Sequence, residues 1–238
     1  MPVNLKYRSK EQEIMDAPNI DNESLKKALA DISRVNQWLG GNNITINAIC
    51  SLVKKIPAST EIVICDLGCG DGEMLRIIAD AFRRKKRNVK LIGIDLNEKS
   101  LQSANKLSED YPEISFFRQN ILEIDTSKFS CDIIISTLTL HHFEDKQIKE
   151  IIKKSVAIAN KAVIINDLHR SIIAYYLFKL FSFFFIKSYI AKNDGLVSIK
   201  RGFKKQELIK FSKKIGVSQY KIDWKWAFRF RWVIKKDL

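Results

Sequence analysis

The sequence predicts an α/β fold organised around a doubly wound, mostly parallel β-sheet. Short apolar runs alternate with amphipathic helical segments between residues 61 and 167, which is the pattern of repeated strand–helix units. A glycine-rich turn at 68–72 follows the first of these predicted strands. The run 132–136 is apolar at its centre, as expected of a parallel strand that is buried on both faces.

Five strand–helix units account for the central part of the chain. Apolar residues recur at helical spacing after each of the first, second and fourth strands, and Asn97 and Asp145 are suitable N-caps for two of these helices. In such a sheet, ligands bind outside the carboxyl ends of the strands. The predicted strands span residues 62–66, 89–95, 114–118, 132–136 and 162–167.

Further elements precede and follow these units. One N-terminal helix should end at Gly40, because glycine favours helix termination, and a second should end before Pro57. Two β-rich runs near the end of the chain should pair as a closing hairpin. We expect a single domain, 1–238, made of an N-terminal helical cap (1–58), a cofactor-binding core (60–167), an apolar helical insertion (168–200) and a C-terminal helix with the hairpin (201–238).

Composition narrows the class of protein. Hydrophobic residues make up 46% of the 238 residues, enough for the core of one domain, and only 9 Gly and 4 Pro argue against long linkers. The 4 cysteines form no C-x-x-C pair, which indicates free thiols in a reducing compartment. The first residues lack the apolar core of a secretory signal, so we expect a cytoplasmic protein.

The chain is strongly basic, with a formal net charge of +14. Such a charge favours anionic partners such as nucleic acid, acidic lipid or an acidic protein. The densest basic block, 83–87, coincides with the predicted end of a helix, where cations are favourable. We therefore interpret this block mainly as a solvated helix end.

The residues from Asp66 to Gly72 carry the clearest functional signal. Glycines at 68, 70 and 72 allow the backbone to turn tightly and to approach a ligand, and the helix start behind them offers free N–H donors. A dinucleotide fingerprint reads G-x-G-x-x-G and has no carboxylate before its first glycine, whereas Asp66 stands there in this chain. A tight turn without a ligand is the alternative.

This acidic G-x-G-x-G loop resembles the first motif of class I S-adenosylmethionine (SAM) methyltransferases. The resemblance implies a Rossmann-like sheet of seven strands, with an antiparallel last strand, and SAM as the methyl donor that leaves as S-adenosylhomocysteine (SAH). A carboxylate at a strand end suits the cationic sulfonium and ammonium groups of SAM. The implied cofactor-binding residues are Asp66, Gly68, Cys69, Gly70 and Gly72 in the loop, Asp95 at the ribose, Leu96, Asn120 and Ile121 at the adenine, and Thr137 at the methionine end.

A narrower resemblance covers nearly the whole chain. Several short motifs are similar to those of bacterial small-molecule methyltransferases encoded beside type III polyketide synthases or aryl-polyene pigment genes, and more distantly to quinone-biosynthesis methyltransferases. This resemblance implies a small hydrophobic acceptor, aromatic or polyene, that is methylated on oxygen or carbon. The motifs lie at residues 13–16, 35–41, 140–143, 166–171 and 194–199.

Two groups of residues are candidates for the catalytic base. His142, and less so His141, follows the fourth strand, and histidine can accept a proton near neutral pH. Asp167 and His169 end the fifth strand, where the carboxylate could orient the imidazole and raise its basicity. Packing or capping roles are the alternatives. We expect no metal, because the histidines and cysteines show no ligand spacing.

The apolar run 171–190 has two functional interpretations besides core packing. It is about as long as a membrane span, but Lys179 falls in its middle, which opposes insertion. We favour a lid over the substrate pocket, and the second interpretation is an interfacial helix in peripheral contact with an anionic membrane. The oligomeric state stays open.

Other functions remain as alternatives. A nucleic-acid methyltransferase would explain the charge, but the Asn/Asp-Pro-Pro-Tyr/Phe motif of amino-group methylation is absent after the fourth strand, so we expect no nucleic-acid partner. A non-catalytic SAM-binding protein is a further alternative, and an NAD dehydrogenase fits least.

Overall fold

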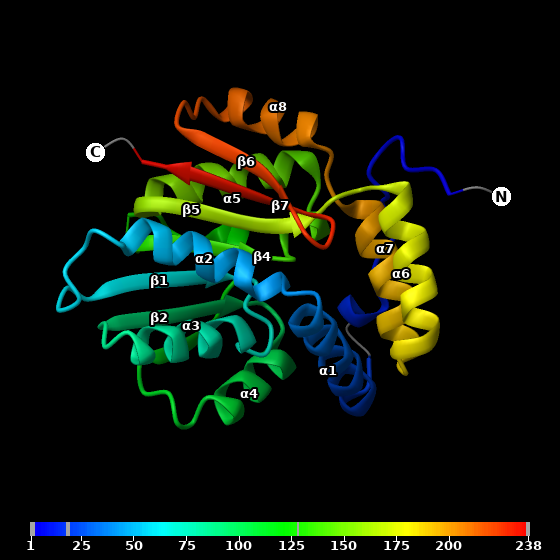
Figure 1. Ribbon diagram of the computed structural model, residues 1–238, viewed down its shortest axis with the longest axis horizontal. Helices are drawn as coiled ribbons and strands as arrows, with labels where there is room; N and C mark the ends of the chain where they lie inside the picture. Colours follow the sequence, from blue (N-terminus) through cyan, green and yellow to red (C-terminus); the bar gives the residue numbers. More distant parts are fainter. Residues whose placement is uncertain (1–2, 18–19, 128, 237–238) are drawn as a thin grey trace.

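A seven-stranded β-sheet forms the centre of the protein (Figure 1). The structure is a computed structural model and describes residues 3–17, 20–127 and 129–236. In the order of the sheet, the strands are β3 (Ile114–Arg118), β2 (Val89–Asp95), β1 (Ile62–Leu67), β4 (Cys131–Thr137), β5 (Ala159–Leu168), β7 (Arg229–Lys235) and β6 (Tyr220–Lys225).

The last strand, β7, runs antiparallel to both of its neighbours, whereas β1 to β5 pair with one another in parallel. Only residues 226–228 connect β6 to β7, and so short a connection permits antiparallel pairing alone. The predicted fold class, a mostly parallel seven-stranded sheet whose last strand is antiparallel, is confirmed.

Helices cover both faces of the sheet and bury the apolar residues that the sequence pattern places there. Ile133 and Ile134 on β4 point to opposite faces and both are fully buried, in two separate core clusters. This explains why the run 132–136 is apolar without alternation. One face is covered by α2 (Gly41–Val53), α3 (Glu73–Arg84) and α4 (Glu98–Leu107), and the other by α5 (Asp145–Ile158) and α8 (Lys205–Ile215).

Three further helices lie beyond the carboxyl ends of the parallel strands rather than on a face of the sheet (Figure 1). Ala28, Ile186 and Ala191 form a small core between them that is separate from the two sheet cores. These helices are α1 (Asn22–Trp38), α6 (Ile172–Phe185) and α7 (Tyr189–Arg201), and short 3₁₀ helices lie at η1 (Ile14–Asp16), η2 (Ile121–Glu123) and η3 (Leu140–His142).

The apolar run 171–190 is divided between α6 and α7 instead of forming one helix. The break has a physical cause, because the Asp31 carboxylate accepts hydrogen bonds from the backbone N–H groups of Lys187 and Ser188, at 3.1 and 2.9 Å. Ser188 then caps α7 by accepting a hydrogen bond from the Ala191 N–H. Within the described residues, no helix combines the length and hydropathy that a membrane-crossing segment needs.

Candidate active site

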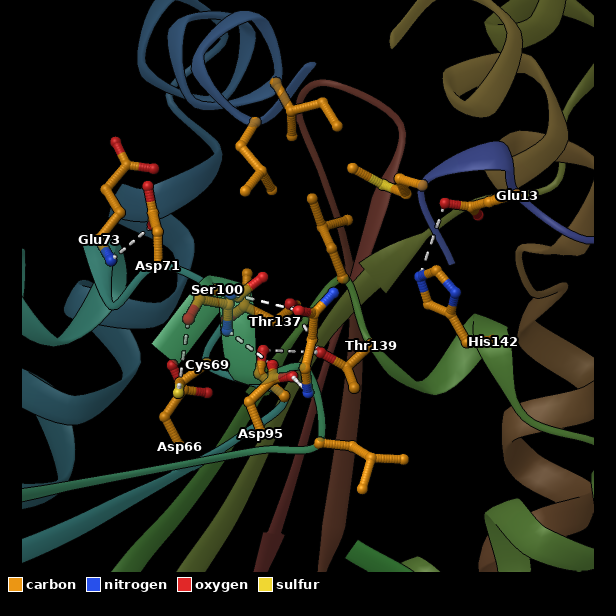
Figure 2. A pocket seen from close by; sticks show the side chains of 18 of the residues that line it. Glu13, Asp66, Cys69, Asp71, Glu73, Asp95, Ser100, Thr137, Thr139 and His142 are labelled. Atoms are coloured by element: carbon orange, nitrogen blue, oxygen red, sulfur yellow. Dashed lines mark hydrogen bonds and ion pairs between the residues drawn. The ribbon is translucent and has the colours of Figure 1, made fainter. Parts of the chain in front are cut away.

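A cavity of about 1000 Å³ lies at the carboxyl ends of β1, β2 and β4 (Figure 2). Asp66, Asp95 and Thr137 occupy these three strand ends and line the cavity. This is the place where the parallel sheet leads us to expect a ligand. The volume is at the upper end of the range for small-molecule sites and leaves room for a cofactor together with an acceptor.

The glycine loop contains three residues with left-handed backbone conformations, and two of them line the cavity. Gly68 has φ +78°, and a Cβ there would lie 2.3 Å from Cγ2 of Thr139, so only glycine fits beside this side chain. Gly70 has φ +55°, and a Cβ there would meet no atom within 4 Å. Gly68, Cys69 and Gly70 all line the cavity, and the space beside Gly70 is open. Gly72 precedes α3 and lies outside the cavity lining.

Two carboxylates dominate the electrostatics of this end of the cavity. Asp66 is 2% exposed, and its Oδ1 has no hydrogen-bond partner among the described residues. Burial, together with the negative charge of Asp95, raises the pKa of Asp66 to about 8. Asp95 accepts hydrogen bonds from the N–H groups of Gly70 and Asn97, at 2.9 and 2.8 Å. Ionisation of Asp66 is therefore costly until a cation enters the cavity.

The other residues predicted to contact the cofactor also line the cavity. Leu96 is exposed and Ile121 is buried, so both present apolar surface. The side-chain oxygen Oδ1 of Asn120 accepts a hydrogen bond from the Leu122 N–H at 3.0 Å and thereby caps η2, which uses part of the polar side chain. The hydroxyl oxygens of Thr137 and Thr45 are 3.2 Å apart and join β4 to α2.

The predicted lid over this cavity is wrong in its location. No residue of 171–190 lines the cavity: α6 and the first part of α7 pack against α1, and α7 reaches the cavity at Ser198. The apolar wall comes instead from α1 and from the segment that precedes it. Its residues are Met15, Ala17, Ile20, Leu25, Leu29 and Ile32.

A buried ion pair joins η3 to the end of β5. Nδ1 of His141 is 2.7 Å from Oδ1 of Asp167, and both side chains are buried. Burial alone would lower the pKa of His141, but the Asp167 carboxylate, and then Glu13, raise it to about 9. The same contact holds the pKa of Asp167 below its usual value against the opposing effect of burial. His141 is therefore an imidazolium at neutral pH.

The predicted pairing of Asp167 with His169 is wrong. The His169 N–H donates to the carbonyl of Phe228 at 2.8 Å, which extends the pairing of β5 with β7 by one residue. The His169 ring lies against Phe230, and its Nδ1 is 3.3 Å from the indole nitrogen of Trp224. His169 does not line the cavity.

Glu13 links the two histidines of η3. One of its oxygens, Oε1, is 3.4 Å from Nε2 of His141, and the other, Oε2, is 3.7 Å from Nε2 of His142. The separation from His141 is that of an ion pair rather than of a short hydrogen bond. Burial opposes the charge of Glu13, but His141 lowers its pKa below the usual value. Figure 2 shows Glu13 and His142 across the cavity from Asp66 and Asp95.

The segment that carries Glu13 is fixed by hydrogen bonds from α7. The Asp194 carboxylate accepts the N–H groups of Ile14 and Met15, both at 2.9 Å, and the Ser198 hydroxyl donates to Glu13 at 2.7 Å. Four of the motifs quoted for the narrower resemblance therefore meet at one place. Sequence reasoning missed the role of Glu13, and its only signal was the joint presence of 13–16 and 194–199 among those motifs.

Glu13 and the two histidines of η3 form a candidate metal-binding set. Donor atoms of Glu13, His141 and His142 lie within 4.8 Å of one another. The contact of His141 with Asp167 matches the carboxylate–histidine pairs that support metal ligands. Our sequence argument against zinc rested on the spacing of histidines and cysteines, and our argument against magnesium on Ser136 and Thr137 at the end of the fourth strand, so neither could include Glu13.

Comparison with known proteins identifies the central domain. Residues 64–161 match a family model described as a methyltransferase domain. The chain carries a methyltransferase domain. No curated protein matches the chain. The domain match spans both the glycine loop and β4, the elements on which the sequence-based prediction of a methyltransferase depended.

Solved structures share the fold of this methyltransferase at low identity. The plantazolicin methyltransferase BpumL in complex with SAH is 19% identical, with a TM-score of 0.68 over 90% of each chain. The CurJ carbon methyltransferase is 15% identical, with a TM-score of 0.65 over 91% of this chain and 61% of that one. The magnesium protoporphyrin IX methyltransferase from Synechocystis PCC 6803 with bound SAH is 14% identical, with a TM-score of 0.57 over 94% and 91%. These structures confirm the predicted fold, and the domain match confirms the predicted methyltransferase.

The cavity of this methyltransferase fits the chemistry of SAM. The buried Asp66 oxygen without a partner and the neighbouring Asp95 suit a ligand with positive charge. The space beside Gly70 lets a ligand approach the backbone closely. We assign the individual contacts of Asp66, Gly68, Cys69, Gly70, Asp95, Leu96, Asn120, Ile121 and Thr137 with SAM as a proposal.

Proposed function

We propose that this enzyme transfers a methyl group from SAM to a hydroxyl oxygen of a small, largely apolar acceptor. The observation that carries this proposal is a single cavity with three kinds of surface. Carboxylates and the glycine loop lie at one end, aliphatic side chains of α1 form a wall, and Glu13 with His142 lies on the opposite side. An acceptor held against that wall would present its hydroxyl between His142 and the cofactor.

His142 would take the proton from the acceptor hydroxyl. Bound SAM supplies an electrophilic methyl group, so the remaining tasks of the protein are to position the acceptor and to remove this proton. His142 is partly exposed and lines the cavity, whereas His141 is buried and already protonated at neutral pH. The Glu13 carboxylate, 3.7 Å from Nε2 of His142, would stabilise the imidazolium that forms.

The proposed acceptor class is supported by the apolar wall of the cavity and by the solved proteins that share this fold. The solved proteins of this fold include enzymes that act on plantazolicin and on magnesium protoporphyrin IX, a carbon methyltransferase, and a domain of the citrinin polyketide synthase. Methylation of carbon is therefore the alternative outcome. We favour oxygen because a carboxylate-supported histidine is most useful for an acceptor that must lose a proton.

The proposal is tested by offering SAM with a panel of phenols, hydroxyquinones and their O-blocked analogues, and by following SAH together with the mass of the product. We expect methylation of a free hydroxyl, with no reaction of the blocked analogue. His142→Gln should reduce kcat about 100-fold and leave SAM binding unchanged. Equal methylation of the blocked analogue would indicate transfer to carbon, and no turnover despite SAM binding would favour a non-catalytic role.

A metal-assisted transfer is the second candidate function. Donor atoms of Glu13, His141 and His142 lie close enough together to bind one metal ion. In that case a divalent metal would replace the proton on Nε2 of His141 and, instead of a proton acceptor, would polarise the hydroxyl. Metal analysis of the purified enzyme, followed by activity after chelation and after addition of Zn²⁺ or Mn²⁺, separates the two. Full activity in the metal-free enzyme would refute this candidate.

A further inference from the structure

The outer side of α6 exposes a set of large apolar side chains that neither the core nor the cavity uses. Phe183 and Phe184 are 72% and 68% exposed, and Leu180 is 60% exposed. None of these residues lines the cavity. We call this set the α6 face, and it consists of Ile172, Ile173, Tyr176, Leu177, Leu180, Phe183 and Phe184.

The α6 face is continuous along one side of the helix. At 3.6 residues per turn, its seven side chains fall within an arc of about 140°. Ala174 and Ser182 lie on the opposite side and are buried, and Phe178 and Phe181 pack into the small core with α1 and α7. The inner side of α6 packs into the protein except at its end, where Phe185 is 53% exposed. The outer side is an apolar stripe of the kind that marks an interaction site.

The segment that contains α6 carries positive charges and no acidic residue. Residues 168–193 contain no Asp or Glu, whereas Lys179, Lys187 and Lys192 accompany the apolar residues. Lys179 is exposed and lies at the margin of the α6 face, where its stem can cover apolar surface while its ammonium group remains in water. The whole chain adds a net charge of +14. The apolar side chains and the lysines together are complementary to a surface with an apolar interior and an anionic boundary.

We propose that the α6 face docks the protein onto an anionic membrane, with α6 lying in the plane of the lipid headgroups. The helix has 14 residues and is about 21 Å long, shorter than the hydrocarbon core of about 30 Å, so it lies on the bilayer. Phe183, Phe184 and Leu180 enter the acyl boundary, while Tyr176 and the lysines remain at headgroup level. Anionic lipid attracts the lysines before the aromatic side chains insert.

A second copy of the chain fits this face less well. Two-fold pairing would place the α6 face against itself and bring Lys179 of each copy to the same boundary. No acidic residue within 168–193 would compensate for these charges, and each chain carries +14. An anionic lipid surface removes this repulsion.

Flotation of the full-length protein with vesicles tests the proposal. We expect binding to vesicles of equal parts phosphatidylcholine and phosphatidylglycerol, weaker binding to phosphatidylcholine alone, and loss of binding at high salt. The triple variant Leu180→Ser, Phe183→Ser, Phe184→Ser should bind at least about tenfold more weakly. Lys179→Glu should reduce binding to the anionic vesicles more than to the neutral ones.

A matched variant controls for the loss of exposed apolar surface in general. Tyr7→Ser, Leu107→Ser and Phe117→Ser remove three exposed apolar side chains outside α6, and this variant should bind vesicles as the wild type does. Circular dichroism and SAM binding should be unchanged in both triple variants. Wild-type protein that stays unbound with anionic vesicles, or an α6 variant that binds normally, would refute the proposal. So would a dimer in light scattering that the α6 variant dissociates.

Discussion

Nδ1 of His141 lies 2.7 Å from a carboxylate oxygen of Asp167, and both residues are sealed from solvent at the end of the cavity. The remaining ring nitrogen faces Glu13 at 3.4 Å. One imidazolium therefore sits between two carboxylates, which compensates charges that would be very costly to bury separately. This arrangement holds η3, β5 and the N-terminal segment in one geometry and positions His142 beside Glu13.

The first prediction concerns the titration of His141. One of the three histidines should keep its proton up to about pH 9, well above the ordinary value of 6.5. Nitrogen-15 NMR of the ring nitrogens measures this directly, with His142→Gln and His169→Gln to assign the signals. Asp167→Asn should lower that pKa, because the main source of the upward shift is removed. A His141 that titrates near 6.5 in the wild type would contradict the assignment.

The same shift has a consequence for stability. Because the pKa of His141 is raised on folding, its stabilising contribution is complete below about pH 6.5 and is lost as the pH rises through about 9. The free energy of unfolding should fall over this window by up to about 3 kcal/mol. Urea denaturation of wild type and Asp167→Asn at several pH values measures this, and the variant should show a shallower decline. Asp66 adds a downward slope below pH 8 that both proteins share.

The second prediction concerns Glu13 as a positioning residue. Glu13→Gln keeps the size of the side chain but removes the charge that faces both histidines. We expect kcat to fall about 10-fold to 100-fold, with an unchanged dissociation constant for SAM and a shifted pH profile. Ser198→Ala is the matched control, since it removes only the 2.7 Å hydrogen bond to Glu13 and should have a smaller effect. A Glu13→Gln enzyme with normal kcat and pH profile would show that the carboxylate has no part in proton removal.

The strand–helix units and the strand ends that line the cavity were predictable because their signals are local. The strand ends at Asp66 and Asp95 follow from apolar runs beside glycines and carboxylates, and the seventh, antiparallel strand followed from the family resemblance. The acceptor end was not predictable in this way. Glu13 reaches His141 from a distant part of the sequence. The two-residue spacing of Asp167 and His169 suggested a pair, but Asp167 contacts His141 instead.

The position of the apolar run 171–190 could not be predicted from local sequence patterns either. The run 171–190 has the composition of a lid or of an interfacial helix, and composition cannot say which side of the fold it covers. Asp31 on α1 decides this, because its carboxylate breaks the run at Lys187 and Ser188 and holds α6 outside the cavity. α1, which is less apolar, covers the cavity instead.

The third prediction compares two glycines of the loop. Gly68→Ala should destabilise the protein by about 3 kcal/mol or more, because a left-handed alanine is strained and its Cβ would lie 2.3 Å from Thr139. Gly70→Ala should cost only about 1 kcal/mol, because its Cβ meets no protein atom within 4 Å. It should nevertheless weaken SAM binding by closing the space beside the backbone. Thermal denaturation and calorimetric titration with SAM measure both effects, and a Gly70→Ala variant with normal affinity would place SAM elsewhere.

The fourth prediction follows from the burial of Asp66. Its pKa of about 8 means that the carboxyl is largely protonated at pH 7 without a ligand, whereas the positive charge of SAM favours the ionised form. SAM binding should therefore release a proton, and its affinity should rise with pH from about 6 until it levels off above about 8. Calorimetric titrations at pH 7 in buffers of different ionisation enthalpy measure the proton, and titrations across the pH range measure the slope. Asp66→Asn has nearly the same shape without the titratable group, so it should bind SAM more weakly and lose both the proton release and the slope. If wild type and Asp66→Asn bind SAM with the same pH dependence, the carboxylate at the end of β1 does not face the cation.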